Sequence, residues 1–198
     1  AARSFGPPGQ RLQVILLDTR WFKSPWDPTP QRDQPGAERY VPTADTTRTL
    51  LGERQWRWLE ARLSEQADLR LLVSGIQVVV DGHGFERWGL FPHERQRLYD
   101  LISRTRAGGV LMLSGDRHIG ALYRETRQTP YPLHELTSSG ITHPWATARE
   151  AGPNRLGELF TAPHFGLVQV DWTTRRVALQ LRDGHNRVQR EHSVALAE

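Results

Sequence analysis

The sequence predicts an α/β (α+β) domain with one large mixed sheet or two stacked sheets. Apolar residues recur at helical spacing within residues 49–107, whereas period-two alternation dominates the later part of the chain. With 198 residues, of which 37% are hydrophobic and 24% charged, the chain can bury one sizeable core. This combination favours neither a helical bundle nor a pure β-sandwich.

The first half alternates strands and helices. Residues 11–17 form a short β-branched run typical of a buried strand, and a proline-rich loop insertion follows at about 21–48. Thr49 is a candidate cap for a helix that extends to about residue 65. Residues 69–80 read as a strand, in which 74–77 are either a bend or the end of the strand and the beginning of a loop. Pro92 suits the first turn of a second helix, which we expect to end near 107–109.

The second half is strand-rich. After the strand at 110–113 we expect strands at 121–124, 133–137, 166–172, 177–181 and 187–193. The hairpin formed by 166–172 and 177–181 is the clearest, because apolar and polar residues alternate in both strands on either side of the turn at 173–175.

Composition limits the classes of function. No cysteine is present, which excludes disulfides and thiolate ligands and leaves the redox compartment open. The net charge is +4, but the basic residues are scattered among the acids without a continuous basic block, so nucleic-acid binding is a distant third hypothesis. No apolar run approaches the roughly 20 residues that span a bilayer, so we expect a soluble chain, either cytoplasmic or periplasmic/extracellular.

The strongest candidate for chemistry is the loop Gly115-Asp116-Arg117-His118, directly after the apolar run 110–113. On an extended backbone Asp116 and His118 would share one face, and their oxygen and nitrogen donors suit a divalent or trivalent cation. Arg117 would then point to the opposite face, outside the site. The alternative is a buried, hydrogen-bonded pair at a strand end.

Several segments in order resemble the PhoD-like (alkaline phosphatase D) family of metallophosphoesterases. The resemblance covers nearly the whole chain and is carried by Gln13–Arg20, Leu51–Glu60, Leu72–Val79, His83–Trp88, Phe91–Arg95, Leu113–His118, Tyr131–Gly140 and the strand from Phe165 to Trp172.

The resemblance implies a four-layer αββα sandwich and hydrolysis of phosphate monoesters or diesters by metal-activated water. Two or more divalent or trivalent metal ions are implied, with iron plus calcium, manganese or zinc left open. Asp116 and His118 match the late metal-ligand motif of the family. Arg20 and His83 are candidate catalytic residues; the alternatives are a salt bridge from Arg20 to Asp18 or Glu135, and an ordinary surface histidine at position 83.

The chain also departs from the family. The early acidic metal motifs have no counterpart, so residues 1–198 are expected to be the C-terminal part of the domain, with its N-terminal half as a partner and little or no activity alone. Expected partners are otherwise a phosphate-ester substrate, with nucleic acid only as a substrate. A non-catalytic phosphate-binding or scaffold fragment is the rival hypothesis. His164 stands where asparagine is expected in relatives.

Overall fold

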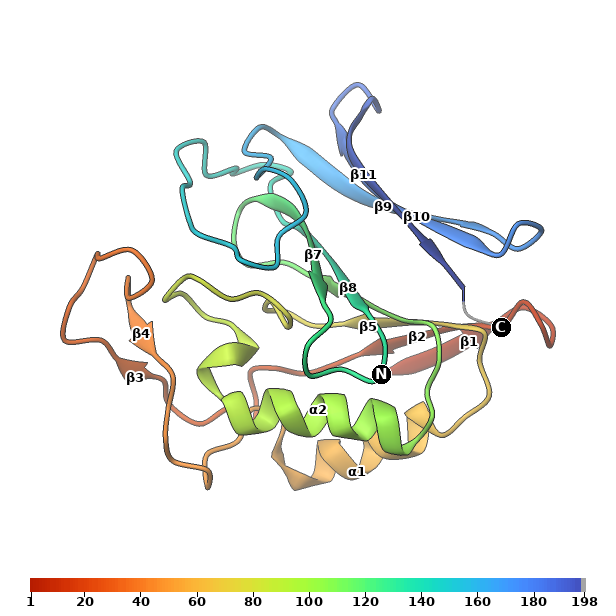
Figure 1. Cartoon of the computed structure of the whole chain (residues 1–198), viewed down its shortest axis with the longest axis horizontal. Coiled ribbons are helices and arrows are strands. Elements are labelled where there is room, and N and C mark those ends of the chain that lie inside the picture. Colours follow the sequence, from red (N-terminus) through yellow and green to blue (C-terminus); the bar gives the residue numbers. More distant parts are fainter. Residues whose placement is uncertain (197–198) are drawn as a thin grey trace.

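The computed structural model describes residues 1–196 and arranges them as helices packed on stacked sheets (Figure 1). The helices are α1 (Gly52–Leu63), the short 3-10 helix η1 (Trp88–Leu90) and α2 (Pro92–Arg104). The strands are β1 (Ala2–Phe5), β2 (Leu12–Leu16), β3 (Asp27–Pro28), β4 (Tyr40–Val41), β5 (Leu69–Val73), β6 (Val110–Ser114), β7 (Gly120–Glu125), β8 (Leu133–Ser138), β9 (His164–Asp171), β10 (Arg176–Asp183) and β11 (Val188–Ala195).

The largest sheet has six strands in the order β1-β2-β5-β6-β8-β7. Strands β2, β5, β6 and β8 are parallel, whereas β1 and β7 pair antiparallel at the two edges. β5 and β6 are buried on both faces, which explains why their sequences are continuous apolar runs. Because parallel strands end at one edge of the sheet, the loops after them meet there.

The sheet is covered on both faces. Helices α1 and α2 lie on one face (Figure 1), where Leu59 and Ile102 join Ile15 in the main core. The three-stranded sheet β11-β10-β9 packs on the other face, where Leu179 and Leu111 belong to a second core. The expected mixed α/β fold is confirmed. Residues 1–196 form three layers in the order helix, sheet, sheet.

The start of α1 is held by polar contacts. Thr49 Oγ1 accepts the Gly52 N–H at 2.8 Å, but the residue at the N-cap of α1 is Leu51, which makes no side-chain cap hydrogen bond, so the predicted cap position is wrong by two residues. Glu94, in the first turn of α2, adds a contact that the sequence did not suggest. Its carboxylate accepts the Leu50 N–H at 2.7 Å and the Trp56 indole N–H at 2.9 Å. One buried acceptor therefore joins the two helices.

Of the two alternatives for residues 74–77, the end of the strand is confirmed, and residues 78–80 do not belong to a strand. β5 ends at Val73, and the chain leaves the sheet although Val78, Val79 and Val80 are fully buried. Their apolar side chains reflect burial under other elements and not strand pairing. The free backbone N–H groups of this segment bond instead to a side chain, described below.

The strands of the second half are confirmed as β7 to β11. In the predicted hairpin Val177 pairs with Val170, and Asp171 Oδ1 accepts the N–H groups of Thr173 and Thr174 in the turn. The second helix ends at Arg104, a little before the expected boundary. The edge strand β1 was not predicted, and the loop insertion contains the short pair β3 and β4.

Candidate active site

The Gly115–His118 loop is a tight turn at the carboxyl end of β6. The Arg117 N–H bonds to the Gly115 carbonyl at 2.9 Å, and both Asp116 (φ 71°) and His118 (φ 56°) adopt left-handed backbone conformations. The expectation of an extended backbone is therefore wrong. Such conformations cost about 1–3 kcal/mol each and persist only where surrounding contacts impose them. Here the His118 N–H bonds to Ser139 Oγ at 2.8 Å, and the His118 carbonyl accepts the Trp145 N–H at 2.7 Å.

Asp116 and His118 open onto one pocket of about 570 Å³. Its walls come from four segments that are far apart in sequence. The lining residues are Asp33, Arg39, Tyr40, Phe85, Glu86, Asp116, Arg117, His118 and Trp145. Arg117 is among them, contrary to its expected exclusion, because the left-handed turn removes the strict alternation of side chains. A separate hollow of about 390 Å³, lined by Arg70 among others, contains neither predicted ligand.

Arg20 reaches the candidate ligands through its side chain. Its guanidinium forms one ion pair with Glu86 and a second with Asp116, where the N···O distance is 3.2 Å. The proposed pairing with Glu135 does not occur, and Asp18 accepts the backbone N–H of Arg20 at 2.8 Å, not its guanidinium. Because the Arg20 side chain is 54% exposed, these ion pairs stabilise the fold little and leave the guanidinium accessible to a ligand.

The carboxyl group of Asp116 lies in a mixed electrostatic environment. Burial is the main cause that raises its pKa above the usual range, and the neighbouring Glu86 raises it further. Arg20, Arg117 and His118 act in the opposite direction. A further cation in the pocket would favour the ionised carboxylate in the same way.

His83 is fully buried behind this pocket and is not among its lining residues. Its Nε2 lies 2.9 Å from Gln77 Oε1, and its Nδ1 accepts the Phe85 N–H at 3.2 Å, so the proton belongs on Nε2. Burial, with Arg117 and Arg87 nearby, holds its pKa well below the usual range. A neutral His83 thus orients the loop that carries Phe85; its catalytic role stays a prediction.

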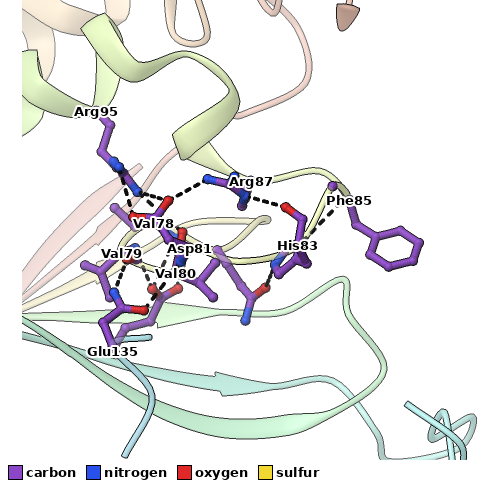
Figure 2. A network of polar contacts seen from close by, with 12 residues as sticks. Val78, Val79, Val80, Asp81, His83, Phe85, Arg87, Arg95 and Glu135 are labelled. Atoms are coloured by element: carbon purple, nitrogen blue, oxygen red, sulfur yellow. Dashed lines mark hydrogen bonds and ion pairs between the residues drawn. The ribbon is translucent and has the colours of Figure 1, made fainter. Parts of the chain in front are cut away.

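A buried polar network positions the 74–88 segment (Figure 2). Glu135 of β8 is fully buried and accepts the N–H groups of Val78 at 2.9 Å and Val79 at 2.7 Å. Asp81 pairs with Arg87 and Arg95, at 2.8 and 3.0 Å. Figure 2 shows the Phe85 ring pointing away from this network. Sequence reasoning missed these roles, and the one available sign was a carboxylate inside the predicted strand that became Leu133–Ser138.

The donors fit part of a metal site. A carboxylate and an imidazole face the same pocket, but within residues 1–196 no group of three or more histidine and acidic residues is arranged to hold a metal ion. A zinc-type site takes about four ligands and a hard-cation site six or more. These residues alone therefore do not make a complete metal site.

Comparisons with known proteins give the family and the fold. The family model described as PhoD-like phosphatase matches residues 3–181. A solved structure titled "Structure of PhoD" superposes with a TM-score of 0.72 at 17% sequence identity, covering 98% of this chain and 42% of that chain. At this identity the likeness shows the fold alone. The chain thus spans less than half the length of that protein.

No protein among the curated sequences matches this chain. In the part of the chain that the structure describes, no helix is both long and apolar enough to cross a bilayer.

Proposed function

Since this chain belongs to the PhoD-like phosphatase family, we propose that it carries part of the active site of a metal-dependent phosphate-ester hydrolase. The observation that carries the proposal is that Asp116 and His118 line one pocket beyond the carboxyl edge of β6, while the guanidinium of Arg20 forms an ion pair with Asp116. This edge is where ligands bind in open α/β sheets.

Each residue has a role that follows from its chemistry. Asp116 and His118 are the metal ligands, and Arg20 binds phosphoryl oxygens, which its planar guanidinium can contact in pairs. A bound cation of this kind neutralises phosphoryl oxygens and lowers the pKa of its water. In the overall reaction a water oxygen bonds to phosphorus, the bond from phosphorus to the leaving oxygen breaks, and that oxygen takes up a proton.

The remaining ligands come, in this proposal, from a polypeptide segment outside this chain. Strand β9 is an edge strand, and Val168 and Val170 on it are only partly buried against the second core. On the large sheet Leu12 and Val14 are likewise partly buried, and Leu16 is 50% exposed. An added layer of strands beside β9 would cover these apolar side chains.

A non-catalytic phosphate-binding or scaffold role is the second candidate. One observation favours it: within residues 1–196 no three histidine or acidic side chains lie together in a way that could hold a metal ion. Elemental analysis separates the two roles. Metal bound in stoichiometric amount only after addition of a polypeptide equivalent to the uncovered part of the solved relative supports the hydrolase. Absence of metal from both forms contradicts it.

The ligand roles are tested in that combined form with p-nitrophenyl phosphate and bis-p-nitrophenyl phosphate. Asp116→Asn and His118→Ala should each lower bound metal and hydrolysis by about two orders of magnitude or more. Asp100→Asn and His185→Ala, at exposed positions outside the pocket, are matched controls that should change neither. Unchanged metal content and rate in both ligand variants would refute the assignment.

A further inference from the structure

One side of the candidate pocket is aromatic. Phe85 and Trp145 meet edge to face, with ring centroids 5.6 Å apart and an interplanar angle of 86°. Tyr40 of β4 lines the same pocket. We call Phe85, Trp145 and Tyr40 the aromatic wall of the pocket. The phosphate-binding groups proposed above need no aromatic neighbours, so the aromatic wall requires a separate explanation.

The wall is fixed to the turn that carries the candidate ligands. The Arg117 guanidinium lies 4.1 Å from the Phe85 ring centroid and 5.5 Å from that of Trp145. Arg117 forms an ion pair with Glu150, and both side chains are almost fully buried. The backbone bond from Trp145 to the His118 carbonyl, at 2.7 Å, is a second link. The distance from the wall to the ligands is therefore set before substrate arrives.

The wall also keeps surface free for a ligand. Trp145 is 37% exposed although Arg117 lies over its ring. Exposed Arg39 lies 5.9 Å from the Phe85 centroid, at the same pocket. The pocket volume of about 570 Å³ is in the range, about 300–1,000 Å³, of pockets that enclose whole small molecules. A phosphoryl group alone would leave the aromatic side unfilled.

The geometry points to a phosphate ester with a planar aromatic group as the substrate class, with Trp145 as the specificity-determining residue that stacks on that group. This inference rests on the proposed function and extends it from the phosphoryl group to the rest of the substrate. A nucleobase and a simple aryl ring share the required chemistry, because both present a flat π-face to an indole.

Binding to the 198-residue chain tests the inference without any hydrolysis. Isothermal titration calorimetry would compare adenosine 5′-monophosphate, phenyl phosphate, glycerol 2-phosphate and inorganic phosphate. Stacking of one base contributes enough that Trp145→Ala should weaken the two aromatic ligands roughly 5- to 150-fold. The same variant should leave the two non-aromatic ligands unchanged. Tighter binding of the nucleotide identifies a nucleobase, and equal binding of both aromatic ligands identifies an aryl ring.

Two variants guard against misfolding. Trp145→Phe should restore most of the affinity, because a ring remains at the same position. Trp21→Ala removes a tryptophan that is 81% exposed and outside the pocket lining, and should change nothing. Equal affinity of all four ligands, or equal loss in the alanine and phenylalanine variants, would overturn the inference.

The outcome is separable from that of the proposed function. Aromatic selectivity without metal binding in the combined form would leave the stacking wall and refute the hydrolase. Equally fast hydrolysis of glycerol and aryl esters, unchanged by Trp145→Ala, would support the hydrolase and refute the stacking role of Trp145.

Discussion

Replacing Glu135 by alanine should lower the free energy of unfolding by about 2–6 kcal/mol, because two buried backbone N–H donors lose the acceptor that they share. The carboxylate is fully buried and accepts the N–H groups of Val78 and Val79 at 2.7–3.2 Å. Its loss leaves two buried N–H donors without a partner, each at about 1–3 kcal/mol. The segment that presents Phe85 and Glu86 to the pocket would lose its main backbone anchor.

Glu135→Gln separates the hydrogen bonds from the charge. Burial raises the pKa of Glu135, so between the ordinary value near 4.5 and the folded value the folded protein binds more protons than the unfolded chain. The wild-type protein therefore loses stability as pH rises through that window. The glutamine variant keeps an acceptor oxygen and lacks this loss, so its stability relative to wild type should improve with rising pH.

Urea denaturation followed by circular dichroism, at several pH values from 4 to 8, measures both effects. Glu158→Ala, at an exposed site, is the matched control and should stay within about 0.5 kcal/mol of wild type. A loss below 1 kcal/mol for Glu135→Ala, or a pH dependence equal in wild type and Glu135→Gln, would refute the reasoning.

Three further variants test other contacts. Glu94→Gln should cost about 1–3 kcal/mol in thermal denaturation because an amide group replaces an acceptor of several buried N–H donors, and a wild-type melting temperature would contradict this. Gly140→Ala should destabilise by about 1–3 kcal/mol, because a Cβ would lie 2.3 Å from the His164 ring; combining it with His164→Ala should recover part of the loss, and strict additivity would contradict the clash. Burial and the neighbouring His192 lower the pKa of His134 from 6.5 to about 4, so stability should fall as pH drops through that range, by at most about 3 kcal/mol. His134→Gln should flatten this part of the urea-denaturation profile, and an unchanged profile would contradict the assignment.

Local patterns in the sequence were enough to locate most elements. Period-two alternation identified the β9–β10 hairpin because each strand buries one face, and the run 110–113 identified β6 because a central parallel strand buries both. The same run located the loop with Asp116 and His118, and the ordered motifs identified the family. Each of these depends on neighbours in sequence, which is why the sequence sufficed.

Only the tertiary structure decided how the loops meet. The apolar residues 78–80 resembled part of a strand, but Glu135, more than fifty residues away, accepts the backbone N–H groups of Val78 and Val79. Left-handed conformations at Asp116 and His118 brought Arg117 into the pocket, and its contacts with Phe85 and Trp145 formed the aromatic wall. Spacing along the chain determines which way a side chain points within a regular element. It does not determine which distant side chain accepts the backbone N–H groups of a loop, because buried polar groups form their hydrogen bonds with whatever groups the packing of the chain brings next to them.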